Sequence, residues 1–269
     1  MVALLPWVQL LRLRSAQTFP SGYFARVSVF LWNTHLIQTM SEVDLYGLHF
    51  HHVIYISYFI AGMGAVDIVI ARHLAGRWLL LHALANLVVT IFCLQDFYLA
   101  VLDPVNSCNS HSYSLIPVYG IAALHLYHLI AFRNLSTSDW VHHLVFGGII
   151  CPVGICFRSG PLLSMAAFFI CGLPGGLDYL MLFLVKQGKL DRLTEKGMNT
   201  RINVWLRSPG LMFTVVFIYI ASKYGAEDSL CRKNYVIAGF MAVLFFLNGQ
   251  YYMQVVALNT ARKVRTYSS

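Results

Sequence analysis

The sequence contains few charged residues. Asp, Glu, Lys and Arg make up 11% of the 269 residues, whereas Ala, Val, Ile, Leu, Met, Phe, Trp, Tyr and Cys make up 58%. A soluble domain carries about 25% charged residues, so a chain this poor in charge could not cover a water-facing surface. The composition excludes an ordinary soluble domain and indicates a protein whose mass lies mainly inside a bilayer.

Linkers, repeats and cysteine motifs are also absent. The chain has no Pro/Ser/Gly tract, no charge run and no repeat period, so we expect one main domain. Its six cysteines form no CxxC and no Cys/His spacing of a zinc module. Four of them lie in apolar runs, and Cys108 and Cys231 lie in predicted loops.

Acidic residues are missing from the first 41 positions, which carry Arg12, Arg14 and Arg26. Residues 1–45 therefore read as an amphipathic helix on the membrane surface or as a targeting segment. Acid-poor, Arg-bearing starts also occur in mitochondrial transit peptides. We favour the surface helix, and with it the endoplasmic reticulum or another endomembrane.

The formal charge of +8 would suggest a nucleic-acid partner in a soluble protein. Here the Lys and Arg residues lie at the ends of apolar runs, which is the pattern of membrane orientation signals. We predict no nucleic-acid partner.

Seven apolar runs are candidates for spanning helices, since a helix needs about 20 mostly apolar residues to cross the hydrocarbon layer. The sequence thus predicts an all-α, polytopic transmembrane bundle over residues 46–260 with a basic cytosolic tail at 261–269. The runs are His51–Ile70, Trp78–Val101, Ser114–Phe132, Val141–Phe157, Pro161–Val185, Pro209–Lys223 and Tyr235–Leu258.

The distribution of Lys and Arg predicts the orientation. Six of them lie between Lys186 and Arg207, and cytoplasmic loops carry the excess of basic residues. This connection and the C-terminus are therefore predicted to be cytosolic. Cys108 and Cys231 then share the opposite face, where they can form a disulfide.

Polar residues in the spans fall mostly at one depth, the predicted cytosolic third of the bilayer. Ionisable residues in spanning segments are costly and mark functional sites by default, so we predict a shared polar pocket. Residues at the headgroup layer, each with its own local role, are the alternative explanation. The predicted site residues are His142, His143 and Asp178 for chemistry, and His125, His128, His82, Asn86 and Asp67 for ligand binding.

His125 and His128 are three residues apart and share a helix face. That spacing is compatible with a metal or a haem, to which His82 could contribute. Because nothing else in the sequence supports a cofactor, we predict no metal and no cofactor.

The stretch Ser138–His143, with sequence SDWVHH, resembles the TLC domain of TRAM, Lag and CLN proteins. In that family a His-His pair opens a membrane helix, and the next helix carries an Asp followed by an apolar run and a Lys. Asp178 within Gly176–Leu180, with Lys186 downstream, is similar to that element. The segment Asn199–Gly210 is similar to the loop that enters the late helices of the family.

The resemblance implies two functions. Ceramide synthases of the family transfer an acyl group from acyl-CoA to a sphingoid base, so His142 or His143 would be the general base and Asp178 its partner. Other members sense or regulate lipids. Those synthases carry more His, Ser and Asp where this chain has Gly172–Gly176, so we favour a protein that binds or regulates a membrane lipid or acyl chain. The alternatives are an acyl-CoA-dependent acyltransferase and a non-catalytic subunit of a larger membrane complex.

Overall fold

The computed structural model describes residues 50–108, 113–157, 159–227 and 229–268. These ranges belong to the unit 43–269, and everything below concerns this unit. The predicted amphipathic or targeting segment at 1–45 lies outside the described residues. The helices are α3 (Phe50–Val69), η2 (Ala71–His73), α4 (Arg77–Leu102), α5 (Ile116–Ala131), α6 (Thr137–Val145), η3 (Phe146–Ile150), α7 (Cys151–Phe157), α8 (Pro161–Ala167), η4 (Phe168–Gly172), α9 (Leu173–Lys186), α10 (Arg192–Ile202), η5 (Asn203–Arg207), α11 (Ser208–Tyr224), α12 (Leu230–Lys233) and α13 (Tyr235–Ser268).

The regular elements in the described part of the chain are all helices and include no strand, which confirms the all-α class. Six helical stretches in it are long and apolar enough to cross a membrane. The third predicted span is α5, which has 16 residues and is about 24 Å long. It falls short of the hydrocarbon thickness of about 30 Å, so the count of seven spans stays a prediction.

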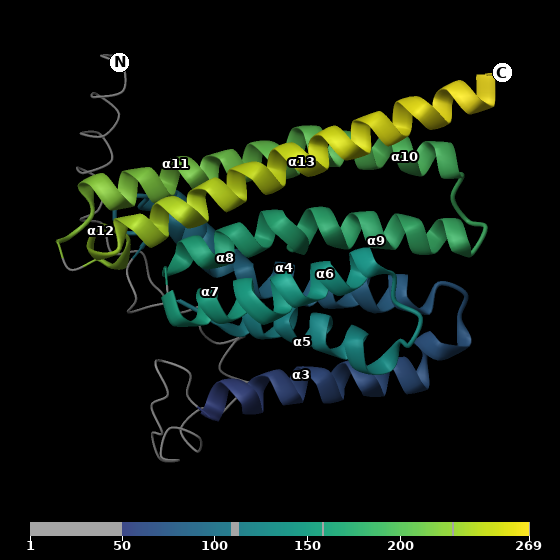
Figure 1. The fold of residues 1–269 in the computed structure, drawn as a ribbon, viewed down its shortest axis with the longest axis horizontal. Coiled ribbons are helices and arrows are strands. Elements are labelled where there is room, and N and C mark those ends of the chain that lie inside the picture. The colour runs from purple at the N-terminus through teal and green to yellow at the C-terminus, as the bar shows by residue number, and fades with distance from the viewer. Residues whose placement is uncertain (1–49, 109–112, 158, 228, 269) are drawn as a thin grey trace, which may run out of the picture. The chain divides into compact units, whose positions relative to one another are not determined.

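The long helices lie side by side, and successive ones run in opposite directions (Figure 1). This gives the bundle two ends. The disulfide end holds the described parts of three connections, residues 103–108 with 113–115, residues 159–160, and residues 225–227 with 229–234. The histidine end holds the connections 70–76, 132–136 and 187–191. Cys108 and Cys231 are joined by a disulfide with their Cα atoms 5.9 Å apart, which confirms that they share one end.

Three of the spans contain a proline in mid-helix, and each follows a wider π-helical turn. Pro152, Pro174 and Pro209 come two residues after the π segments η3, η4 and η5. Proline has no N–H, and its ring clashes with the carbonyl four residues earlier. In each segment the residue before the proline donates instead to the carbonyl five residues back, as Ser208 does to Asn203. The wider turn accommodates the ring, so each helix continues.

This arrangement corrects one prediction. The expected loop at Asn199–Gly210 is helical, and α10, η5 and α11 form one stretch from Arg192 to Tyr224. Pro209 follows the π turn η5 within this continuous stretch and does not start a new helix. Arg207 is therefore part of a spanning helix and not of a cytosolic loop.

The polar helix α10 packs along the C-terminal half of α13, and together they extend the bundle at the histidine end (Figure 1). Thr200 and Thr260 are hydrogen-bonded through their hydroxyls at 2.8 Å. With 34 residues, α13 is about 51 Å long and exceeds the bilayer core. The predicted basic tail, residues 261–268, continues this helix.

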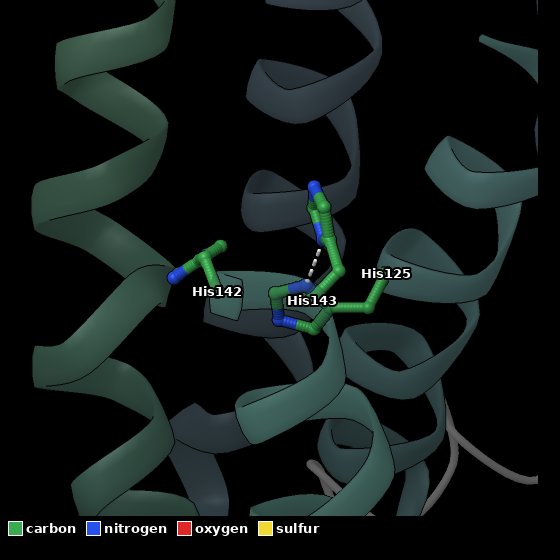
Figure 2. Close-up of side chains that lie close together, drawn as sticks. All are labelled: His125, His142 and His143. Carbon is green, nitrogen blue, oxygen red and sulfur yellow. Dashed lines mark hydrogen bonds between the residues drawn. The ribbon is translucent and has the colours of Figure 1, made fainter. Parts of the chain in front are cut away.

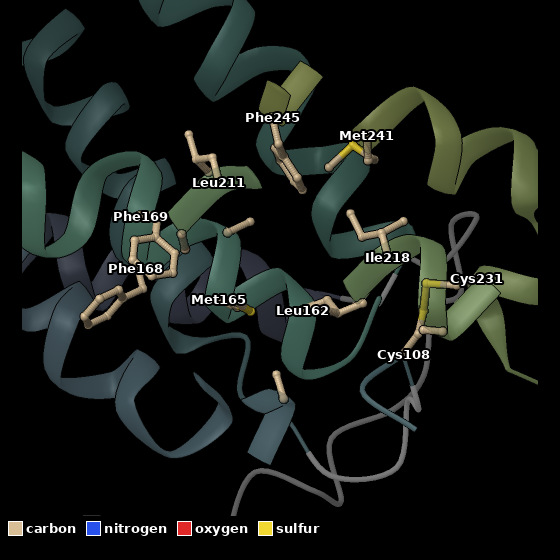
Figure 3. Packing of buried hydrophobic residues seen from close by; sticks show 14 of the residues in the cluster. Cys108, Leu162, Met165, Phe168, Phe169, Leu211, Ile218, Cys231, Met241 and Phe245 are labelled. Carbon is tan, nitrogen blue, oxygen red and sulfur yellow. A yellow bond between two sulfur atoms is a disulfide. The ribbon is translucent and has the colours of Figure 1, made fainter. Parts of the chain in front are cut away.

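Aromatic and aliphatic side chains fill the interior near the disulfide end (Figure 3). Phe168 and Phe169 from η4 pack with Leu211 of α11 and with Phe245 of α13 in one buried cluster. Gly210 makes room for this packing, because a Cβ there would lie 2.1 Å from a ring carbon of Phe169. The cluster holds η4, α11 and α13 together beside the functional site.

Candidate functional site

Five histidines from α4, α5 and α6 gather toward the histidine end of the bundle. A capping box between Ser136 and Asp139 starts α6 and sets its rotational phase. Gly147 lets this helix approach α5 closely, since a Cβ there would lie 2.9 Å from the Cβ of His125. The cluster consists of His82, His125, His128, His142 and His143, and His142 is the member that is only half-buried.

His143 forms the centre of a hydrogen-bonded chain of imidazoles. Its Nδ1 lies 2.7 Å from Nδ1 of His125, and its Nε2 contacts Nδ1 of His128. Figure 2 shows His125 and His143 joined in this way, with His142 beside them. A neutral imidazole has one donor and one acceptor nitrogen, so the three rings form a directional chain. A proton taken up by one ring could pass along it.

To bind a metal ion, the imidazole rings of His125, His142 and His143 would have to move. One nitrogen from each of His125, His142 and His143 lies within 4.8 Å of the others, so the three could converge on an ion. Two nitrogens on a tetrahedral zinc, each about 2.0–2.1 Å from the metal, would lie about 3.3 Å apart. The 2.7 Å contact between His125 and His143 fits a hydrogen bond better.

Aromatic rings hold the remaining imidazoles. Trp78 stacks on His128 with ring centroids 3.4 Å apart and meets His82 edge-on at 3.7 Å. His82 stacks on Tyr179 of α9 at 4.0 Å. These contacts fix the side-chain rotamers and connect the histidine cluster to α9.

A cavity of about 280 Å³ lies beside the cluster. Asp178, His125 and His142 all line it, which confirms the geometric prediction that Asp178 shares a cavity with these histidines. His82 and Asn86 line it too, whereas His128 and His143 lie behind its wall. The roles predicted for these residues stay predictions. The lining also includes Val118, Ile121, Leu163, Ala166, Ala167, Ile170, Gly175, Tyr179, Arg207, Met241, Phe245, Asn248 and Tyr252.

The cavity lining changes from apolar to polar along the bundle axis. On α5, Val118 and Ile121 lie nearer the disulfide end than His125 does. On α13, Met241 and Phe245 precede Asn248 and Tyr252 in the same direction, and Val255 and Val256 add apolar contacts beyond Tyr252. The stretch from α8 to α9 repeats the order, from Leu163, Ala166 and Ala167 to Asp178 and Tyr179. The polar side chains thus gather toward the histidine end of the cavity, and the opposite end is apolar.

Asp178 is hydrogen-bonded to a side chain of α10. Its Oδ1 accepts a hydrogen bond from Asn199 at 2.6 Å, and no hydrogen bond in the described residues joins it to His142 or His143. The helices explain this, because Asp178 on α9 faces α10 while the histidines lie on α6. In this structure Asn199 is the hydrogen-bond partner of Asp178, and the orienting role toward His142 or His143 stays a prediction.

Gly175 and Gly176 let α9 pack closely against α4. A Cβ at Gly175 would come within 2.9 Å of Nδ2 of Asn86, and one at Gly176 would lie 3.4 Å from the Asn86 Cβ. This close packing places Asn86 at the cavity.

Asp67 lies outside the cavity, contrary to its predicted binding role. Nε of Arg77 donates to Oδ1 of Asp67 at 2.5 Å, Nη2 of Arg77 contacts Oδ2, and the Tyr127 hydroxyl donates to Oδ2 at 2.6 Å. The carboxylate is 2% exposed. It closes the turn between α3 and α4, so in this structure Asp67 forms a structural bridge.

We expect Asp67→Asn to lower stability by about 2 kcal/mol, because charge-assisted hydrogen bonds are lost and an amide donor faces Arg77 and Tyr127. Thermal unfolding in detergent measures the effect. Glu227→Gln is the control, since its ion pair with Arg232 is solvent-exposed and contributes about 1 kcal/mol or less. Equal shifts for the two variants would contradict this role for Asp67.

Several cavity residues were not predicted as site residues, Arg207, Tyr179 and Tyr252 among them. Asn199, Asn203 and Arg207 follow one another at four-residue intervals, and this spacing puts them on one helix face. The signal was hidden because Pro209 suggests a helix start, which leaves Arg207 in a loop.

Comparison of the chain with protein-family models, with curated proteins and with solved structures gives no match. Its function must therefore be argued from the site itself.

Proposed function

We propose that this chain binds a single-chain lipid or acyl chain inside the membrane. The polar head lies among His125, His142 and Asp178, and the apolar chain extends toward the disulfide end between α5, α8 and α13. The observation that carries the proposal is the sorting of the lining, which is apolar at one end and gathers its polar side chains toward the other. One amphiphile matches that sorting, whereas water or a wholly apolar molecule does not.

The cavity volume narrows the class of lipid. Ligand pockets of about 300–1,000 Å³ hold drug-sized molecules, and about 280 Å³ lies just below that range. A single acyl chain with a small head suits this volume better than a two-chain phospholipid.

The orientation of the site follows from two separate features. Disulfides persist in oxidising compartments, which suits a luminal or external disulfide end. The basic connection 186–192 and the C-terminus lie at the opposite end, in keeping with a cytosolic face. We therefore place the lipid head in the cytosolic leaflet of an endomembrane such as the endoplasmic reticulum. The resemblance to TLC domains at Ser138–His143 supports the same assignment.

Acyl transfer from acyl-CoA is the second candidate, and the imidazole chain favours it. His125 lines the cavity and is hydrogen-bonded to His143, so it could take a proton from an amine or hydroxyl and pass it onward. A base must lie about 2.6–3.2 Å from the proton it removes, and a head group at the polar end would meet that condition. A purely structural subunit would need neither this chain nor a polar cavity.

Native mass spectrometry of protein purified in a mild detergent tests lipid binding. We expect one single-chain lipid per protein, lost on delipidation and restored by adding it back. Protein that carries no such lipid and takes none up would contradict the proposal.

Incubation with acyl-CoA and a panel of amine and alcohol lipids tests the second candidate. Turnover that His125→Ala and His143→Ala both abolish, while lipid binding survives, would establish an enzyme. Absence of turnover with binding intact favours the binding role.

A further inference from the structure

Arg207 is a buried cation in a spanning helix. Its side chain lines the cavity and is 6% exposed. Within the described residues no ion pair joins it to a carboxylate. An unpaired charge inside a membrane is costly and points to a functional role, so the partner of this guanidinium needs to be identified.

A hydrogen-bonded network fixes the guanidinium in place. Nη1 of Arg207 donates to Oδ1 of Asn203 at 2.8 Å, and Nδ2 of Asn203 donates to Oδ1 of Asn199 at 2.6 Å. Asn199 in turn holds Asp178 at 2.6 Å. The carbon of the guanidinium also lies 5.2 Å from the ring centroid of Tyr252. The network uses one of the three nitrogens and leaves the other two available.

Hydrogen-bond donors that the network leaves unused lie close together in the cavity wall. Nε of Arg207 is buried and has no hydrogen-bond partner in the described structure. A Cβ at Gly175 would lie 3.8 Å from Nη2 of Arg207 and 2.9 Å from Nδ2 of Asn86. Gly175, Arg207 and Asn86 all line the cavity, and the bare glycine lets both donors lie close to this part of its wall. A buried donor without a partner is rare and costly, and Nε of Arg207 indicates where an acceptor oxygen belongs.

We propose that Arg207 and Asn86 recognise a negatively charged head group on the single-chain lipid, a carboxylate or a phosphate. A guanidinium binds either through parallel N–H···O bonds, and both present the acceptor oxygens that the unused donors require. Asp178 is a carboxylate in the same cavity, and its hydrogen bond to Asn199 holds it toward α10. This inference rests on the proposed function and specifies its ligand.

Binding titrations on delipidated full-length protein test the inference with three probes of equal chain length: a fatty acid, a lysophosphatidic acid and a fatty alcohol. We expect at least one anionic probe to bind ten or more times tighter than the alcohol. Comparison of the fatty acid with the lysophosphatidic acid then shows whether a carboxylate or a phosphate head is preferred. Arg207→Gln is expected to remove this preference and Arg207→Lys to retain part of it. Arg201→Gln, an exposed arginine on the same continuous helix, is the matched control and should leave the preference unchanged.

Equal binding of anions and alcohol by the wild type would overturn the anion site, even if Arg207→Gln failed to fold. A preference that persists in folded Arg207→Gln would also overturn it. Failure of all three probes to bind would instead overturn the underlying proposal of lipid binding.

Discussion

Replacing Cys108 with serine is expected to lower the free energy of unfolding by about 2–5 kcal/mol. The bond joins residues 123 positions apart, and in the chain-entropy model a cross-link over a long loop removes the most freedom from the unfolded chain. It ties the connection between α4 and α5 to α12, beside the core of α11 and α13. Both cysteines are buried, at 0% and 1% exposure, so the variant also places a polar hydroxyl in the interior.

Thermal unfolding in detergent, with and without reductant, measures this effect. Cys231→Ser should lower the stability by the same amount as Cys108→Ser. The double variant should be only slightly less stable than either single variant, because all three lose the same bond. Cys156→Ser, at an exposed cysteine outside the disulfide, is the control. A stability unchanged in Cys108→Ser, or a thiol at Cys108 that labels without reductant, would contradict the bond.

Filling the apolar end of the cavity is expected to weaken lipid binding roughly a hundredfold. Ala167 lines the cavity and is 5% exposed. In Ala167→Phe the new ring would take the space of about four methylenes of an acyl chain. Each buried methylene contributes about 0.8 kcal/mol, so the loss is about 3 kcal/mol, and each 1.4 kcal/mol is tenfold in affinity.

The matched control is Ala65→Phe, which adds the same ring to an exposed alanine of α3. Both variants should be checked for thermal stability, since overpacking costs about 1–3 kcal/mol. Titration with the preferred lipid then compares the affinities of the two variants, and only Ala167→Phe should bind it more weakly. Unchanged affinity in folded Ala167→Phe would mean that the chain does not occupy this space.

Hydropathy and helix length predicted most of the fold. Seven apolar runs correspond to observed helices because lipid leaves backbone groups no partners outside their own segment, so continuous apolar runs must be helical. Alternating direction then put Cys108 and Cys231 at one end, as found. The same reasoning placed Asp178 and the histidines at matched depths, and the structure puts His125, His142 and Asp178 on one cavity.

Depth alone did not predict which side chains meet. Asp67 has the depth of the site but pairs with Arg77 across the turn between α3 and α4, because partner choice depends on helix rotation as well as on depth. Arg207 was assigned to a loop because proline normally marks a helix start. The π-helical turn before Pro209 keeps the helix continuous, and π-helical turns are frequent at functional sites. Pro152 and Pro174 follow the same pattern, so a mid-span proline beside polar residues is worth examining in similar sequences.

Photocrosslinking tests the central claim, a lipid held with its head at the histidine end, most directly. Protein in its native membrane would be exposed to a single-chain lipid with a diazirine at the chain end, and to a second with the diazirine beside the head. We predict that the chain-end probe labels the segments around Leu163–Ala167 and Met241–Phe245, that the head probe labels segments around His142 and Asp178, and that excess unlabelled lipid prevents both. Labelling confined to outward-facing residues such as Leu87 and Phe240, which are 52% and 57% exposed, with no competition by unlabelled lipid, would contradict the account.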